Sequence, residues 1–269
     1  MENIDVTYCI CLKQRRAHMD LFFKKVKVKN LIFIDPFLGS NLAKYSEEEL
    51  ISKNYITHNH ILKKNNVNYH NKIANAITFI NIFKQFLNTS YKNCLILEDD
   101  LKIPNQLEID LINYRMNLLF TIINPNWQYI NLGRCWDRSC ERHKQYSASY
   151  FDVERCLPVC THSIILKKEI AKYLLHNTLP LYEPKDNTWR KIIHSDKYWK
   201  DYAYCSVPAI FQQDRKTVIS TLIPNNVNPN ECIGRKKINY QYNYNEYFNR
   251  VIILLSLIIL FKCFQIFYL

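Results

Sequence analysis

Three consecutive acidic residues, Glu98, Asp99 and Asp100, directly follow a short apolar run, CLIL at residues 94 to 97. Such a run is typical of a buried strand, and open α/β sheets bind ligands at the carboxyl ends of their strands. Clustered carboxylates repel one another unless a cation neutralises them, and hard oxygen ligands suit Mg²⁺ or Mn²⁺. The sequence therefore indicates either a metal site for a diphosphate-bearing substrate or a plain acidic turn after a strand. The period of a strand places Glu98 and Asp100 on one side and Asp99 on the other.

The composition narrows the ways in which such a site could hold phosphate. Three glycines among 269 residues, Gly39, Gly133 and Gly234, are too far apart to build a glycine-rich phosphate loop. Phosphate must then be held by a metal ion, by Lys or Arg, or by a helix N-terminus. The net charge of +12 favours anionic partners. The basic residues are dispersed and form no concentrated groove, so we do not expect nucleic acid to be the partner.

The cysteines and the N-terminus bear on the compartment. The first residues show no charged start followed by an apolar stretch, so no signal peptide is expected. Without an export signal, the ten cysteines are predicted to be reduced thiols in a cytosolic compartment. A zinc site is a further hypothesis, although the spacings do not follow the CxxC pattern. Its ligands would come from Cys135, Cys140, His143, Cys156, Cys160 and His162.

The C-terminal residues 251 to 261 are apolar except for Ser256, and Arg250 precedes them. With the residues up to Leu269 this segment is marginally long enough to span a bilayer, provided that Lys262 snorkels. We predict a single-pass C-terminal membrane anchor with the preceding domain on the cytosolic side; an interfacial amphipathic helix is the alternative. The predicted organisation is a domain at 1–224, a basic polar linker at 225–250 and the anchor at 251–269.

The order of apolar runs and helical patterns predicts one α/β domain with a mostly parallel central sheet flanked by helices. Loops are expected at 134–156 and at 180–200, the second facing the substrate. Strands are expected near 5–12, 30–34, 94–97, 127–132, 159–166 and 204–211, and helices near 16–23, 47–50, 73–87, 107–123 and 168–175.

Five segments in this order resemble glycosyltransferase family 25, which contains lipooligosaccharide and collagen galactosyltransferases. The resemblance runs from about residue 5 to residue 223. The matching segments are YCICLKQRR near the start, ILEDD ending at Asp100, INLGR at 130 to 134, THSIILKKEIAKYLL at 161 to 175, and VPAIFQQDRKTVIST at 207 to 221.

The resemblance implies a nucleotide-sugar-binding domain of the GT-A kind, a UDP-hexose donor, Mn²⁺ or Mg²⁺, and inversion at the anomeric carbon. The hexose, galactose or glucose, would go to a hydroxyl of a glycan or protein acceptor. Asp100, supported by Asp99 or Glu98, would hold the metal ion.

The remaining roles are assigned by the same resemblance. Asp196 would be the general base, with Asp186 and Asp201 as rivals. Arg16 would contact a phosphate or the uracil, and His162 would line the sugar pocket. Glu98 would belong to the donor site.

One departure leaves a second hypothesis open. Where the family has Gly-Cys and Ser-His pairs in the helix before ILEDD, this chain has Ala74 and Asn75, then Thr78 and Phe79. The alternative is a catalytically degenerate, membrane-tethered module that binds glycans without turnover. A third reading, a metal-dependent nuclease, lacks further acids at nuclease spacing.

Overall fold

The computed structural model describes residues 1–63, 69–133, 144–148, 151–155 and 160–214. All of them belong to the first of the two units into which the chain divides, Met1–Cys232. The predicted linker and the predicted anchor at 251–269 lie outside these described residues. Within the described residues, no helix combines the length and the apolar character needed to cross a bilayer.

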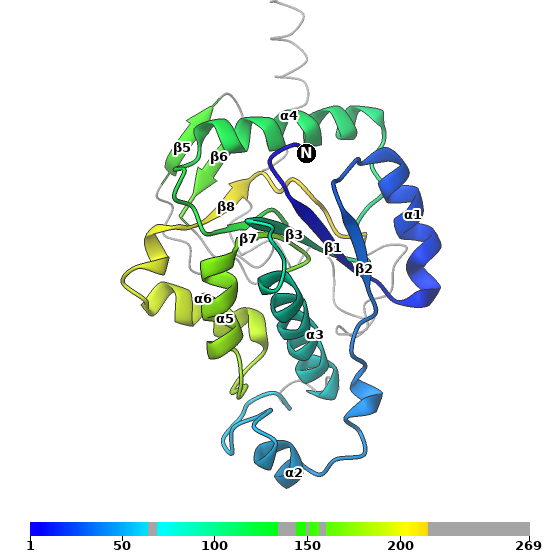
Figure 1. Cartoon of the computed structure of the whole chain (residues 1–269), viewed down its shortest axis with the longest axis vertical. Coiled ribbons are helices and arrows are strands. Elements are labelled where there is room, and N and C mark those ends of the chain that lie inside the picture. Colours follow the sequence, from blue (N-terminus) through cyan, green and yellow to red (C-terminus); the bar gives the residue numbers. More distant parts are fainter. Residues whose placement is uncertain (64–68, 134–143, 149–150, 156–159, 215–269) are drawn as a thin grey trace, which may run out of the picture. The chain divides into compact units, whose positions relative to one another are not determined.

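The strands described form one eight-stranded sheet in the order β2-β1-β3-β7-β4-β8-β6-β5 (Figure 1). Strands β1 and β2 pair in parallel, as do β1 and β3, and β4 and β8. Strand β7 lies between β3 and β4 and is antiparallel to both. The bounds are β1 Val6–Ile10, β2 Leu31–Ile34, β3 Asn93–Glu98, β4 Tyr129–Asn131, β5 Lys144–Ala148, β6 Phe151–Glu154, β7 Ser163–Lys167 and β8 Ala203–Val207.

The prediction of an α/β fold with a mostly parallel sheet is confirmed for the six strands that lie side by side as β2-β1-β3-β7-β4-β8. All of these except β7 run in one direction. The remaining strands, β6 and β5, form an antiparallel hairpin that extends the sheet beside β8. This hairpin falls within the stretch 134–156 that was predicted to be a loop. A mixed sheet of this kind follows when one edge of a parallel sheet grows by hairpin pairing.

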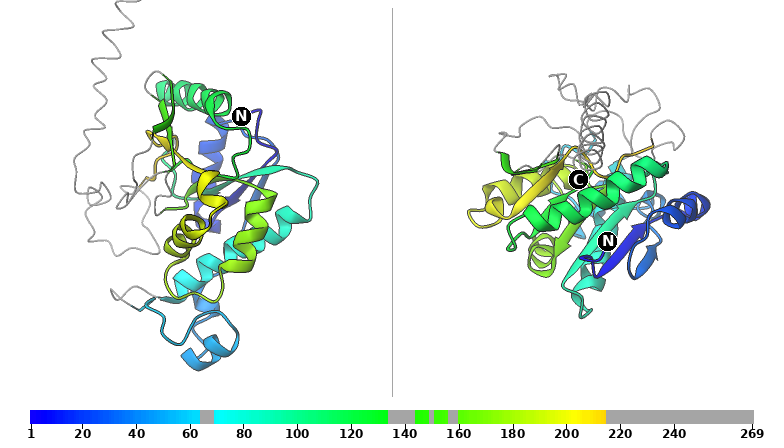
Figure 2. Two further views of the ribbon diagram at one scale, coloured as in Figure 1. Left: turned by 90° about the vertical axis from the view of Figure 1, so that its left-hand side faces the viewer. Right: turned by 90° about the horizontal axis from the view of Figure 1, so that it is seen from above.

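Helices cover both faces of the sheet. Figures 1 and 2 show α1 and α4 on one face and α3, α5 and α6 on the other. The bounds are α1 Arg16–Lys25, α2 Glu47–Ser52, α3 Tyr69–Leu87, α4 Gln106–Ile122, α5 Lys168–Asn177 and α6 Lys185–Ser195, with short 3₁₀ turns η1 Lys13–Arg15, η2 Gly39–Asn41 and η3 Trp199–Asp201.

Strand β1 is buried along its whole length and β3 at its four central residues, because each strand packs between two helical layers. On β3, Leu95 and Leu97 contact the core beneath α1 and α4, whereas Cys94 and Ile96 contact the core beneath α3, α5 and α6. All four side chains are fully buried. Burial on both faces explains the continuous apolar run seen in the sequence.

Two helices begin with a capping box that fixes where they start. In α4 the Asn105 side chain accepts from Glu108 N–H, and the Glu108 carboxylate accepts from Asn105 N–H. Ser46 and Glu49 make the same pair of bonds at α2. Each box satisfies backbone donors that the first turn of a helix leaves without a partner.

The stretch 180–200 contains a helix, so the prediction of a loop there was wrong. Helix α6 places Trp189 and Ile193, four residues apart, in the core. The Trp189 ring packs against Phe79 and Phe83 of α3, with ring centroids 5.3 and 5.5 Å away. The predicted strand at 204–211 is also shorter than expected, because β8 ends at Val207, directly before Pro208.

Candidate active site

The acidic residues lie at the carboxyl end of β3, where the ends of several strands meet. We call this end of the strands the acidic edge and the opposite end the far edge. Glu98 is the last residue of β3 and is in register with Ile10, the last residue of β1. Strand β7 runs in the opposite direction, so the residues before it reach the same edge. Glu98 N–H donates to the carbonyl oxygen of His162 at 2.9 Å. The ends of β1 and β3 and the start of β7 therefore build this edge together.

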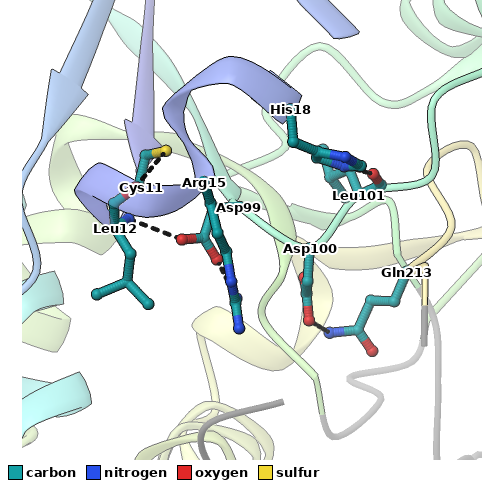
Figure 3. A network of polar contacts seen from close by, with 8 residues as sticks. All are labelled: Cys11, Leu12, Arg15, His18, Asp99, Asp100, Leu101 and Gln213. Carbon is teal, nitrogen blue, oxygen red and sulfur yellow. Dashed lines mark hydrogen bonds and ion pairs between the residues drawn. The ribbon is translucent and has the colours of Figure 1, made fainter. Parts of the chain in front are cut away.

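Asp99 is committed to the turn that follows β1. Its carboxylate accepts from Leu12 N–H at 2.7 Å and from the Arg15 guanidinium at 2.7 Å (Figure 3). The residue is 8% exposed, so the ion pair is shielded from solvent. Each oxygen of the Asp99 carboxylate accepts one hydrogen bond, and the two bonds connect the residues around η1 to the end of β3.

Asp100 points away from these partners and toward Gln213, as Figure 3 shows. Gln213 Nε2 donates to Asp100 Oδ2 at 2.9 Å, and Asp214 N–H donates to the Asp100 carbonyl oxygen at 2.6 Å. Leu101 and Gln213 form an isolated antiparallel bridge. The segment after β8 thus holds Asp100 in place. Asp99 and Asp100 face different partners although both lie in the turn that follows β3.

Glu98 faces a third environment, made by the start of β7 and by α6. Thr161 Oγ1 donates to Glu98 Oε1 at 3.3 Å, and Lys185 Nζ donates to Thr161 Oγ1 at 2.5 Å. Lys185 is 4% exposed, and its ammonium lies 3.9 Å from the ring centroid of Phe79 and 5.1 Å from that of Trp189. A charged lysine is rarely buried so fully without an acidic partner.

Burial in this cluster shifts the pKa values of Glu98 and Lys185 toward each other. Burial raises the pKa of Glu98 to about 7; Lys185 opposes the rise, whereas Asp100, Asp99 and Asp186 add to it. Burial likewise lowers the pKa of Lys185, while Glu98 and Asp186 counteract that effect. Asp186, in the first turn of α6, therefore belongs to the same group of charges.

The residues present fit a divalent ion only if the substrate completes its coordination. In the described part of the chain no group of three His, Cys, Asp or Glu residues is placed to hold a metal ion. Mg²⁺ in nucleotide sites is typically held by one or two carboxylates together with substrate phosphates. Asp100 fits such a shared ion. Asp99, predicted as a second ligand, accepts one bond on each oxygen, from Leu12 and Arg15, so a metal ion there would share the carboxylate with Arg15.

Arg15, rather than the predicted Arg16, faces the acidic residues. The Arg16 guanidinium stacks 3.9 Å from the Phe33 ring centroid and pairs with Asp35 at 3.4 Å. It therefore lies over β2. The two arginines are adjacent in the sequence, but Arg15 ends η1 and Arg16 begins α1. The change of backbone direction between them points the Arg15 side chain toward Asp99.

His162 is a packing residue at the start of β7. It is 2% exposed, and Nε2 lies 3.3 Å from the carbonyl oxygen of Phe211. A Cβ atom at Gly133 would overlap the His162 ring, so β4 and β7 converge closely here. The side chain is enclosed by protein, which does not favour the predicted role in lining a sugar pocket.

The structure does not bring Asp196 to the acidic residues. Its carboxylate accepts from Tyr198 N–H at 2.8 Å and from Trp199 N–H at 3.0 Å, and chiefly the Trp199 bond lowers its pKa. This turn precedes β8, whose first residue, Ala203, is level with the start of β3 through β4 and β7. Asp196 therefore lies at the opposite edge of the sheet.

The two alternative candidates for the general base, Asp201 and Asp186, lie in different parts of the fold. Asp201, which forms an ion pair with Arg155 at 2.9 Å, also lies directly before β8 and thus at the far edge. Asp186 follows Lys185 directly in α6, next to the residue that bonds Thr161, and its charge raises the pKa of both Glu98 and Lys185. Of the three acids considered for the base, only Asp186 shares the site.

The residues at the point of departure from the family pattern have structural partners. Thr78 Oγ1 accepts from Phe37 N–H at 3.0 Å and donates to the Ala74 carbonyl oxygen at 2.9 Å. Phe79 is fully buried beneath Lys185. Neither side chain contributes a group that could bind a metal ion or a phosphate.

The prediction that the cysteines are reduced thiols is confirmed for four of those that the structure describes. Cys9, Cys11, Cys94 and Cys205 are buried free thiols. Cys160 is disulfide-bonded, so the prediction that all cysteines are reduced was wrong at this position; its partner is outside the described residues. The other cysteines of the zinc hypothesis, and His143, also lie outside them.

No direct signal in the sequence points to Lys185, Thr161 or Arg15. Lys185 lies in a charged stretch interpreted as a loop, Thr161 belongs to a longer motif, and the resemblance favours Arg16 over Arg15. Gln213 lies within the matching segment at 207 to 221. Comparison with known proteins adds no family: no protein-family model matches the sequence, and no curated protein matches it.

Proposed function

We propose that the protein is a metal-dependent glycosyltransferase resembling family 25, which transfers a hexose from a UDP-sugar to a hydroxyl of a glycan or protein acceptor. One observation carries the proposal: Asp100 is held by Gln213 just after the carboxyl end of a buried strand, next in sequence to the Asp99–Arg15 ion pair and two residues from Glu98. Ligands of open α/β sheets bind at such an edge. We infer a nucleotide-sugar fold of the GT-A kind and inversion from the resemblance of the motifs.

Asp100 is the residue that we assign to Mn²⁺ or Mg²⁺. When bound, the ion supplies positive charge that stabilises the departing UDP. Gln213 fixes the Asp100 carboxylate in one orientation. Arg15, whose side chain is 17% exposed, takes the place that the sequence suggested for Arg16 and contributes a cation beside the diphosphate.

Asp186 is the acid that we assign as general base for the acceptor hydroxyl. It is partly exposed in the first turn of α6, and it lies close enough to Glu98 and Lys185 to affect the charge of both. A base must come within hydrogen-bond reach of the proton that it removes. Asp186 meets the condition of lying at the donor edge, which Asp196 and Asp201 do not.

Binding of UDP in the presence and absence of Mn²⁺, measured by calorimetry on the full chain, tests the metal assignment. Asp100→Asn should abolish the manganese-dependent part of UDP binding, because it removes the carboxylate that holds the ion. Asp110→Asn, an exposed substitution on α4, is the matched control. Binding that is the same in Asp100→Asn and in the wild type would remove Asp100 from the site.

Turnover of UDP-galactose and UDP-glucose tests the enzyme and its base. Asp186→Asn should lower kcat on the order of 100- to 10,000-fold, the usual contribution of general base catalysis. Asp196→Asn should leave kcat unchanged, since that residue caps a turn at the far edge. Equal losses in the two variants would contradict the choice of Asp186.

The non-catalytic module is the second candidate. It is favoured by Thr78 and Phe79, which serve packing where the family has polar residues. Such a protein would bind UDP with manganese and turn over none of the UDP-hexoses. The same two measurements therefore distinguish the candidates.

A further inference from the structure

Lys185 is a buried cation that the proposed reaction has not used. It projects from the first position of α6 into the space between α3 and the acidic edge of the sheet, where it is 4% exposed. Two aromatic rings lie beside its ammonium, and one hydroxyl accepts a hydrogen bond from it. These contacts give the Lys185 ammonium group a fixed position, which a solvent-exposed lysine would not have.

The hydroxyl of Thr161 links this ammonium to Glu98. An ammonium group can only donate, so Thr161 Oγ1 accepts from Lys185 at 2.5 Å. The single hydroxyl hydrogen is then directed to Glu98 Oε1, 3.3 Å away. The chain Lys185, Thr161, Glu98 therefore has one consistent direction of donation, which ends on the carboxylate.

Both ends of this chain are fixed by elements of the core. The ammonium lies over Phe79, which is fully buried and packs edge-on against Trp189. Glu98 is the last residue of β3, and its N–H is bonded to His162 next to Thr161. Neither end can shift without moving α3, α6 or the central strands.

We propose that Lys185 and Thr161 are positioning residues that orient the Glu98 carboxylate to accept a hydrogen bond from a sugar hydroxyl in the reacting complex. The proposal rests on the proposed function, because it assigns Glu98 to the sugar rather than to the metal ion. Thr161 engages Oε1, and the ammonium of Lys185 holds the Thr161 hydroxyl in the orientation that donates to it. Misplacing such a group slows the reaction more than it weakens binding of the nucleotide.

A purely structural role for the same contacts predicts a different result. If Thr161 and Lys185 only stabilise the fold, their loss lowers the unfolding midpoint and leaves the kcat of the folded protein unchanged. The two roles are therefore separated by measuring kcat, the affinity for UDP with Mn²⁺, and stability on each variant.

Thr161→Val is the decisive variant, because it removes the hydroxyl while keeping both charges and nearly the same volume. We expect kcat for UDP-galactose or UDP-glucose to fall on the order of 10- to 100-fold, the range typical when a supporting partner of an active-site group is lost. The affinity for UDP with Mn²⁺ should stay at the wild-type value. Thr161→Ser, which keeps the hydroxyl, should restore most of the turnover.

Thr7→Val is the matched control. Thr7 is a fully buried strand threonine in β1, and the change likewise removes a hydroxyl from the core. Its kcat should equal that of the wild type. Lys185→Met is a second variant, with the same expected loss of kcat; should it fail to fold, Thr161→Val decides alone.

The outcomes separate this inference from the proposed function. Wild-type protein that neither binds UDP with Mn²⁺ nor turns over a UDP-hexose overturns both, and binding without turnover overturns both the enzyme and the positioning role. Wild-type turnover with unchanged kcat in Thr161→Val overturns only the positioning role. An equal loss in Thr161→Ser and Thr161→Val, or in Thr7→Val, also overturns it.

Discussion

Glu98 and Asp99 are adjacent in the chain but differ in what compensates their charge. Asp99 has a guanidinium and a backbone N–H, both at 2.7 Å. Glu98 has a neutral hydroxyl as its hydrogen-bond donor, with the ammonium of Lys185 one step further away. This difference explains why burial dominates at Glu98, whose pKa rises to about 7.

The raised pKa of Glu98 predicts how stability varies with pH. A carboxyl with a folded-state pKa above its unfolded value of 4.5 favours the fold while it is protonated, and this advantage is lost as pH rises through about 7. Glu98→Gln cannot ionise and lacks this loss. Between pH 5 and pH 8, the variant should therefore gain up to about 3 kcal/mol of unfolding free energy relative to the wild type.

Urea denaturation of both proteins across this pH range measures the effect. Glu48→Gln, at an exposed position on α2, is the control and should follow the wild-type curve. Parallel curves for Glu98→Gln and the wild type would contradict the raised pKa.

The sequence alone could locate the acidic site, but it could not show which partner each acidic residue has. The run CLILEDD predicted an acidic strand end, and the structure places it where expected. The strand period also predicted different directions for Asp99 and Asp100, which do face apart (Figure 3), but both residues lie in the turn after β3 rather than in extended chain. The partners, however, come from residues 84 to 113 positions away, such as Arg15 and Gln213, and no local pattern reports contacts at that range.

At the element scale, Gly133, two residues after β4, lies tightly against the start of β7. Its N–H donates to Asn131 Oδ1 at 3.0 Å, and an added Cβ would overlap the side chains of His162 and Ser163. The position therefore requires glycine for reasons of space. The same approach holds the start of β7, and with it Thr161, against the acidic edge.

Gly133→Ala should lower the unfolding free energy by about 1–3 kcal/mol, the usual cost of overpacking a core. Combining it with His162→Ala should cost less than the sum of the two single changes, because the smaller side chain makes room for the methyl group. Chemical denaturation of the four proteins in this cycle gives the coupling. Strict additivity would show that the two residues are not in conflict.

The elements predicted most clearly have either a long helical repeat or an uninterrupted apolar run. Helix α3 shows the first over 19 residues, and strand β3 shows the second at residues 94 to 97. Helix α6 was missed because only Trp189 and Ile193 anchor it, among charged residues. Its stability comes from packing on α3, which a short pattern does not reveal.

For the whole molecule, the sheet separates two chemically distinct edges. The acidic edge carries Asp100, Glu98 and Asp186, and the far edge carries Asp196 and Asp201 in turns before β8. The topology could be predicted only in part, since the reversed strand β7 looks like any other buried strand in the sequence. Its direction decides which residues reach the acidic edge.

The disulfide at Cys160 leads to a prediction about the compartment. Disulfides persist in oxidising environments, which argues against the cytosolic placement expected from the sequence. Alkylation of full-length protein before and after reduction, followed by mass spectrometry, should show Cys160 oxidised and Cys9, Cys11, Cys94 and Cys205 reduced. A free Cys160 thiol in protein from its natural compartment would restore the cytosolic placement.

The position of β7 between β3 and β4 also sets an order of events during synthesis. Both neighbours of β4, which are β7 and β8, lie later in the chain than β4 itself. A nascent chain that has reached residue 131 thus carries β4 with neither partner yet made. Chains of this kind fold from the N-terminus as they emerge, and unpaired strand edges promote aggregation. Strand β7 can join β3 to β4 only after residue 167 has left the ribosome, and β4 gains its second neighbour only after residue 207. Chaperones therefore have a defined interval in which to protect the unpaired strand.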